Sequence, residues 1–99
     1  MSRFTGKLLM PQRIEDGVEV VVDIEAETLS IIAGDHFIGI WPLSDVGIRG
    51  EDDGFHLKME GEEVVLVTKD EAGFALAVGI RSASPIMRRR ISRGLDDPR

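Results

Sequence analysis

Short apolar runs that repeat with a period of two constrain the fold of this chain more than any other feature. Between residues 18 and 25, four aliphatic side chains alternate with acidic ones, and only Val21 breaks the alternation. Successive side chains of a β-strand point to opposite faces, so this pattern is typical of a strand with one buried face. Similar runs are found at residues 6–10, 28–33, 36–43, 45–49, 55–59 and 64–68.

Glycine and acidic residues separate these runs at short intervals. Residues 52–54 are Asp-Asp-Gly, and Asp-Gly suits the positive φ angles of a tight hairpin turn. Residues 60–62, Glu-Gly-Glu, predict the next turn. Seven short strands with short connections indicate an antiparallel meander, which has to close into a barrel or fold into two packed sheets.

The segment after Thr68 fits two patterns. Apolar residues alternate from 74 to 80 as in a strand, yet some also have helical spacing. We favour a helix at about 70–82, because Asp70 is a good N-cap and alanines follow it. Ser84 and Pro85 then predict the start of a second, short helix, which we expect to stop at Gly94. Residues 1–83 are thus expected to form one domain, followed by a basic short helix and a polar tail at 84–99, with 95–99 frayed.

Composition narrows the class of protein. With 42% hydrophobic and 30% charged residues the chain is typical of a globular domain. It has no cysteine, which excludes a disulfide framework, a thiol nucleophile and a thiolate metal site. No apolar run reaches the roughly 7–15 residues of a secretory signal or the about 20 of a membrane span, so we expect a cytoplasmic protein.

Charge is unevenly distributed along the chain. Of the net charge of −6, residues 1–83 contribute 16 acidic and 7 basic side chains, and residues 84–99 contribute 2 acidic and 5 basic ones. Phosphate backbones and anionic bilayers are bound by clustered Lys and Arg, so only the tail of this chain is suited to binding them. A basic tail of this kind would also allow the protein to lie at the periphery of a membrane. Four arginines form the candidate contact: Arg88, Arg89, Arg90 and Arg93.

This basic tail has several interpretations. It could contact anionic lipid or nucleic acid, or it could form a kinase recognition element, since residues 89–92 have the basic-basic-x-Ser form ending at Ser92. The structural alternative is favourable charge at a helix C-terminus together with pairing to the acidic body.

No constellation in the sequence predicts catalysis, a cofactor or a metal site. His36 lies at a turn and His56 on the polar phase of a strand, and neither has a convergent partner in the sequence. The acidic groups at 51–53 and 60–63 lack the spacing of a calcium loop, and solvated turns explain them better. Glycines at 47, 50 and 54 open no phosphate-binding helix, so we assign them to backbone geometry. We therefore expect a protein that is not an enzyme.

The run at residues 36–43 is apolar on both phases. In a regular strand Trp41 and Phe37 would share one face, opposite Ile38 and Ile40. Such a strand is either buried on two sides or exposes an apolar face. Core packing of Trp41 is the simpler interpretation, and an outer aromatic patch that binds a partner is the alternative.

Seven antiparallel strands followed by a helix is the element order of the pleckstrin-homology-like superfold. The chain also resembles small actinobacterial proteins of unknown function with a pleckstrin-homology-like domain. The segments that carry this resemblance are TLSIIAGD at 28–35, IWPL at 40–43, GEEVVL at 61–66 and TKDEAGFA at 68–75. The resemblance implies a barrel of two nearly orthogonal sheets closed by the C-terminal helix, with an SH3-like or OB-type barrel as the structural alternative.

Two departures from this family limit what the resemblance implies. Lipid-binding members carry basic residues in the loop after the first strand, whereas residues 11–17 here contain one arginine and two acids. The only tryptophan is Trp41, in a predicted strand, whereas members often carry one in the helix. We therefore do not expect phosphoinositide binding, and the fold alone does not specify a function.

The function that we expect is a non-catalytic protein-interaction module. In this superfold the groove between the fifth strand and the helix can take an extended peptide, because the unpaired backbone groups of an edge strand accept another strand. Arg49 and Arg81 would favour an acidic peptide there. The alternative is attachment to anionic membrane or nucleic acid through the tail, and the sequence is silent on oligomeric state. The residues of the candidate groove are Val46, Gly47, Ile48, Arg49, Phe74, Val78 and Arg81.

Overall fold

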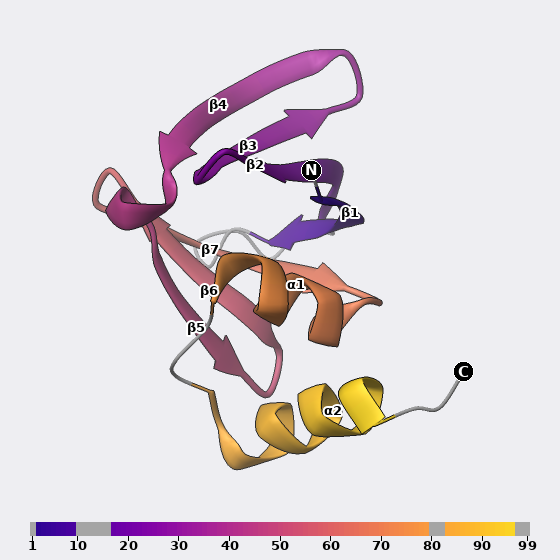
Figure 1. The fold of residues 1–99 in the computed structure, drawn as a ribbon. Helices are drawn as coiled ribbons and strands as arrows, with labels where there is room; N and C mark the ends of the chain where they lie inside the picture. The colour runs from indigo at the N-terminus through magenta and orange to yellow at the C-terminus, as the bar shows by residue number, and fades with distance from the viewer. Residues whose placement is uncertain (1, 10–16, 80–82, 97–99) are drawn as a thin grey trace.

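A computed structural model describes residues 2–9, 17–79 and 83–96 as seven strands followed by two helices (Figure 1). A short 3₁₀ turn, Leu43–Asp45, lies between the fourth and fifth strands. The helices are α1, Glu71–Val78, and α2, Pro85–Asp96. The strands are β1 Ser2–Leu9, β2 Val18–Glu25, β3 Thr28–Ala33, β4 His36–Pro42, β5 Gly47–Glu51, β6 Gly54–Met59 and β7 Glu62–Thr68.

All seven strands belong to one antiparallel sheet in the order β4-β3-β2-β1-β7-β6-β5. The predicted seven antiparallel strands and the mainly β class are therefore confirmed. The sheet curls into a half-barrel, with α1 and α2 on the side of β5 to β7 (Figure 1). Among the described strands, β4 and β5 are the two edges, since hydrogen-bonded pairing ends at each of them.

The turns explain how the meander reverses. As predicted, Asp52 and Asp53 connect β5 to β6, and Gly54 follows with a φ of 144°. At Gly54 a Cβ atom would lie 2.7 Å from the carbonyl oxygen of Leu66, so the residue allows close approach of β6 to β7. The β2–β3 turn differs, because Ala26 and Glu27 both adopt left-handed φ angles of 52° and 62°. Tight hairpins favour such angles, but Asn and Gly adopt them at lower cost than Ala and Glu.

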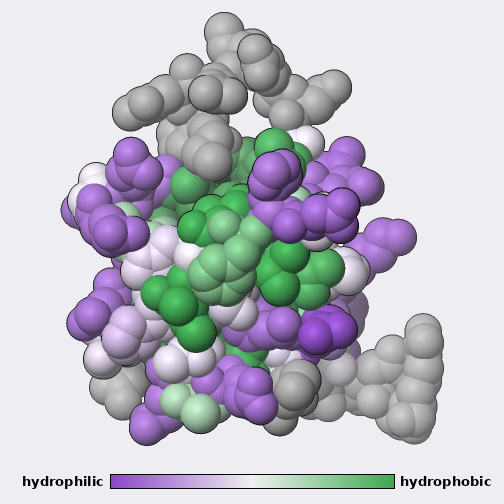
Figure 2. Space-filling view, turned by 90° about the horizontal axis from the view of Figure 1, so that it is seen from above, coloured by the Kyte–Doolittle hydropathy of each residue, from purple (hydrophilic) through white to green (hydrophobic). Residues whose placement is uncertain are grey.

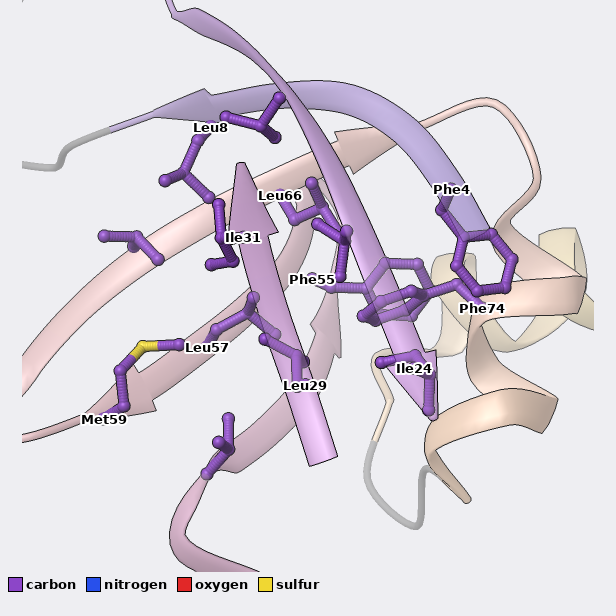
Figure 3. Packing of buried hydrophobic residues seen from close by; sticks show 14 of the residues in the cluster. Phe4, Leu8, Ile24, Leu29, Ile31, Phe55, Leu57, Met59, Leu66 and Phe74 are labelled. Carbon is purple, nitrogen blue, oxygen red and sulfur yellow. The ribbon is translucent and has the colours of Figure 1, made fainter. Parts of the chain in front are cut away.

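The concave face of the sheet holds the core. Most of the alternating residues predicted to face inward are buried, and they meet side chains from both halves of the sheet (Figure 3). Val18, at the start of β2, is an exception, since it is 49% exposed. Phe74 of α1 is fully buried between Phe4 and Phe55, at ring-centroid distances of 5.4 and 4.8 Å. The helix thus adds its side chains to the same core. The predicted core residues confirmed in this way are Val20, Val22, Ile24, Leu57 and Leu66.

Both predicted helices are present, with two corrections. The first helix does not run to about residue 82, because α1 ends at Val78, where Gly79 adopts a left-handed φ of 67° and caps it. Asp70 caps α1 by accepting a hydrogen bond from the Gly73 amide at 3.0 Å. The predicted stop of α2 at Gly94 is wrong, since the helix continues to Asp96. A Cβ at Gly94 would lie 2.8 Å from the Cβ of Ala72, so this glycine allows α2 to pack against α1. Positions 80–82 and 97–99 of the predicted segments lie outside the described residues.

None of the helices described here has the length and apolar character needed to cross a bilayer.

Candidate binding surfaces

The groove predicted between β5 and α1 is mostly core in the structure. Gly47 is exposed, but Val46 and Phe74 are buried. Ile48 and Val78 are half-buried and pack against the hydrophobic core. The remaining two predicted groove residues are Arg49, which belongs to the ionic cluster described below, and Arg81, which lies outside the described residues.

The free edge of β5 is also partly covered by the chain itself. Gly50 forms a parallel bridge with Ala83, and the amide of Ser84 donates to the carbonyl oxygen of Gly50 at 2.7 Å. The Ser84 hydroxyl donates to Asp52 at 2.5 Å and accepts from the amide of Met87 at 3.1 Å. Ser84 therefore caps α2 and fixes its start against the β5–β6 hairpin. An added strand would have to displace this segment.

A cluster of charged side chains joins β5, β6 and β7 on the outer face of the sheet. Arg49 donates from Nε to Glu51 at 2.8 Å and from Nη1 to Glu63 at 3.0 Å. His56 lies with Nε2 2.8 Å from Asp53 and Nδ1 3.2 Å from Glu63. The sequence shows no convergent partner for His56, whereas the fold supplies two. His36 is exposed at the start of β4.

The contacts within this cluster shift the pKa values of His56 and Glu63 in opposite directions. Partial burial lowers the pKa of His56, but its hydrogen bonds to Asp53 and Glu63 outweigh burial, and the pKa lies above its usual 6.5. Hydrogen bonds from Arg49 and His56 hold the pKa of Glu63 below its usual 4.5. The His56 contribution to stability is therefore full below pH 6.5 and is lost as pH rises through its raised pKa. The Glu63 contribution is present above pH 4.5 and is lost as pH falls through its lowered pKa.

The side chains of the ionic cluster pair mainly with one another, and Ser84 lines the same open, shallow pocket as Arg49 and His56. The opposite charges of the cluster lie within hydrogen-bond distance of one another, which suits a clamp across three strands. Within residues 2–9, 17–79 and 83–96, no group of three His, Cys, Asp or Glu side chains is arranged to hold a metal ion.

Strand β4 contains a bulge that changes which side chains share a face. Gly39 pairs with Ile31, but Ile32 pairs with Phe37, so Ile38 is an extra residue. The expectation that Phe37 shares a face with Trp41 is therefore wrong. Trp41 pairs with the buried Leu29 and packs against the core, whereas Phe37 lies on the outer face.

Trp41 itself is half-buried, and it packs against the core as the simpler interpretation predicts. Its indole Nε1 donates to a carboxylate oxygen of Glu60 at 2.7 Å. The indole N–H thus has a partner at the rim of the sheet, as a partly buried tryptophan usually requires.

The outward side of β4 exposes large apolar side chains. Phe37, Ile38 and Ile40, here called the β4 patch, have exposed fractions of 62%, 47% and 55%. No charged residue lies between Asp35 and Asp45. Figure 2 looks down on the side where β4 lies and shows a hydrophobic area bordered by hydrophilic residues. Edge strands usually carry charges that prevent pairing with other chains, so this edge is unusual.

The arginines of the tail divide into two groups. Arg90 is partly buried and pairs with Glu71 of α1 through two contacts, at 2.8 and 2.9 Å. Met87 is fully buried on the same side of α2 and fixes the rotation of the helix. The outward side of the helix exposes Arg88, Arg89, Ser92 and Arg93. Three of the four predicted contact arginines thus share one accessible face, and Arg90 belongs to the α1–α2 interface.

No protein-family model, curated protein or solved structure matches this chain. Its function is therefore inferred from the geometry of these surfaces.

The ionic cluster is a feature that the sequence did not identify as a site, whereas for β4 the sequence offered an exposed apolar face only as the alternative to core packing. The uncharged stretch between Asp35 and Asp45 is the signal that could have identified the patch, because an edge strand without charges is uncommon. No comparable signal exists for the cluster around His56, whose members come from three strands and one turn.

Proposed function

We propose that this protein is a non-catalytic interaction module that takes up an extended segment of a protein partner by strand addition at β4. The observation that carries the proposal is the β4 patch, three large apolar side chains on an uncharged edge strand. Strand addition derives affinity from backbone hydrogen bonds and specificity from alternate side chains. The edge of β5, which the sequence favours, is less suitable because Ala83 and Ser84 already lie along it.

The hydrogen-bond phase of β4 supports this proposal. The amide of Leu43 donates to the carbonyl oxygen of Glu27 at 2.8 Å, in the same register as the β3–β4 pairs. Hydrogen-bonded and non-hydrogen-bonded pairs alternate along an antiparallel ladder. Trp41 therefore bonds toward β3, and the N–H and C=O of Ile40 point away from the sheet. Pro42 lacks an N–H, and its place on the outward phase agrees with this assignment.

We further propose that the fold is pleckstrin-homology-like, with α1 closing one end of the curled sheet. The element order of seven antiparallel strands followed by a helix supports this assignment. The burial of Phe74 against Phe4 and Phe55 supports the closing role, because these rings come from α1, β1 and β6.

Peptide selection followed by NMR tests the proposed function. Peptides selected from a random phage-displayed library on the immobilised protein are titrated into the ¹⁵N-labelled protein. We expect shifts at the amides of residues 37–41, and at least a tenfold loss of affinity in Ile40→Lys. The matched control is Leu76→Lys on α1, since Leu76 is 66% exposed and should leave binding within twofold. Shifts confined to β5 and α1, or unchanged binding by Ile40→Lys, would contradict the proposal.

A second candidate function is attachment to anionic phosphate groups through α2. The outward-facing Arg88, Arg89 and Arg93 favour it, although each exposed basic residue contributes only about 1 kcal/mol near an anionic membrane. Binding to anionic vesicles or to duplex DNA should weaken steeply as ionic strength rises. Replacing the three arginines by glutamine should abolish it, and Lys58→Gln on β6 is the control. Absence of binding to both probes at low salt would eliminate this candidate.

A further inference from the structure

We infer that the segment taken up at β4 is a basic one, a short apolar stretch of a partner protein with Lys or Arg on each side. The inference rests on the proposed function, because it requires that the edge of β4 accepts an extended segment. It adds the chemical class of that segment.

Basic residues are absent from the half of the sheet that contains β4. No Lys or Arg occurs from residue 14 to residue 48, a stretch that includes β2, β3 and β4. Among the described residues, Asp23 is the one carboxylate of this half that pairs with a base, Arg3 of β1. Four exposed or partly buried arginines lie instead on α2, at the far end of the molecule from β4 (Figure 1). The carboxylates of β2 to β4 and their turns are Glu19, Asp23, Glu25, Glu27, Asp35 and Asp45.

The end of β4 near Pro42 is surrounded by carboxylates. Two turns from other parts of the sheet reach it. The amide of Leu43 donates to the carbonyl oxygen of Glu27 in the β2–β3 turn at 2.8 Å, and Glu60 in the β6–β7 turn accepts from Trp41 at 2.7 Å. The exposed acidic residues at this end are Glu27, Asp45 and Glu60.

The opposite end of β4 also has a carboxylate. Asp35 is exposed in the β3–β4 turn, two positions before Phe37. A basic side chain there can pair with Asp35 and lie against the exposed ring of Phe37, because cations are attracted to the faces of aromatic rings. Since β4 has seven residues, its ends lie roughly 20 Å apart at about 3.3 Å per residue. An extended partner would therefore carry its basic residues about six positions apart, with apolar side chains between them.

Backbone pairing alone does not select a partner at this edge. Between the bulge at Ile38 and Pro42, Ile40 offers the outward N–H and C=O, and any strand can use these two groups. Selection has to come from side chains. Acidic ends on the partner would place like charges against the carboxylates at both ends of β4, whereas basic ends place opposite charges there. The net charge of −6 adds a longer-range attraction for a basic segment.

The peptides selected on the immobilised protein test this class of partner. We expect those that shift the amides of residues 37–41 to carry Lys or Arg on both sides of an apolar stretch. Replacing these basic residues by glutamine should weaken binding at least tenfold at low salt, and high salt should remove most of that difference. Peptides that shift the same amides and bind equally well after the replacement would overturn the inference and leave the proposed function standing. If no peptide shifts these amides, both fail.

Charge variants of the protein locate the attraction. Asp35→Asn combined with Asp45→Asn should weaken binding of the basic peptides at least fivefold. The matched control, Glu51→Gln combined with Asp53→Asn, removes two charges from the β5–β6 hairpin at the other edge of the sheet and should leave the affinity within twofold. Circular-dichroism spectra of both variants should match that of the wild type. Equal losses in the two variants would mean that the charge of the whole chain attracts the peptides, and would overturn the inference.

Discussion

Replacing Phe74 with alanine is the most direct test of how α1 is joined to the sheet. Phe74 is fully buried, and its ring contacts Phe4 edge-on and Phe55 at a tilt of 48°. Truncating a buried phenylalanine to alanine costs about 3–5 kcal/mol, which includes the cavity that remains. A domain of this size has about 5–15 kcal/mol in total, so the variant should be close to unfolding.

Chemical denaturation followed by far-ultraviolet circular dichroism measures this cost. A loss of 3 kcal/mol corresponds to a fall in Tm of at least about 12 °C for a domain of about 100 residues. Phe74→Leu keeps the site apolar and should cost only about 1 kcal/mol of stability. Its free energy of unfolding can therefore still be measured if the alanine variant does not fold. Leu76→Ala on the same helix should change stability by less than about 0.5 kcal/mol, because Leu76 is largely exposed.

The outcome that refutes this reasoning is a similar cost for Phe74→Ala and Leu76→Ala. It would mean that the face of α1 assigned to the core is not the face that packs. A double-mutant cycle between Phe74→Leu and Phe4→Leu would further measure the ring contact, for which we expect a coupling energy of about 0.5–1.5 kcal/mol.

Three other substitutions test separate features. The wild type should lose stability as pH rises from about 6.5 through the raised pKa of His56, and His56→Gln should abolish that part of the loss. Urea denaturation across pH 6–9 measures it, and a pH profile unchanged by the substitution would contradict the hydrogen bonds assigned to His56. Gly6→Ala should destabilise the sheet by about 1–3 kcal/mol, because its Cβ would clash with the backbone of Val67, and a neutral effect in thermal unfolding would argue against the β1–β7 approach. Replacing Ala26 by Asn and Glu27 by Gly should stabilise the protein by about 1 kcal/mol, since these residues adopt positive φ at lower cost, and a lower Tm would refute the turn assignment.

The paired strands could be predicted from the sequence because their signals are local. Val20, Val22 and Ile24 recur at every second position, and a strand places them on one face whatever its partners are. The Asp-Asp-Gly turn and the Asp70 cap are likewise properties of a few consecutive residues. The bounds of β2 and β3 agree with the sequence for this reason.

The faces of β4 could not be predicted from periodicity. A single inserted residue, Ile38, shifts Phe37 to the other side of the sheet, and a run that is apolar on both phases contains no mark of the insertion. The stop expected at Gly94 was wrong for a related reason. Glycine ends helices, but it also allows close packing, and only the position of Ala72 on α1 distinguishes the two roles.

The surroundings of His56 depend on the register of three strands. Arg49 lies opposite His56 in the β5–β6 pair, and Glu63 comes from β7, one strand further along the sheet. A shift of one residue in either pair would separate these side chains. The covering of the β5 edge is also a long-range feature that the sequence does not show. Ala83, just before α2, bridges Gly50 from more than thirty positions away.

The central place of β1 in the sheet has a consequence for synthesis on the ribosome. The first strand is hydrogen-bonded on one side to β2, which follows it closely, and on the other to β7, about 60 positions later. Its second edge therefore has no native partner until residues 65–68 of β7 have emerged. Contacts of such long sequence separation slow folding, so the nascent chain should carry an open apolar edge for most of its translation. A chaperone that covers β1 during this interval would be expected to raise the yield of folded protein.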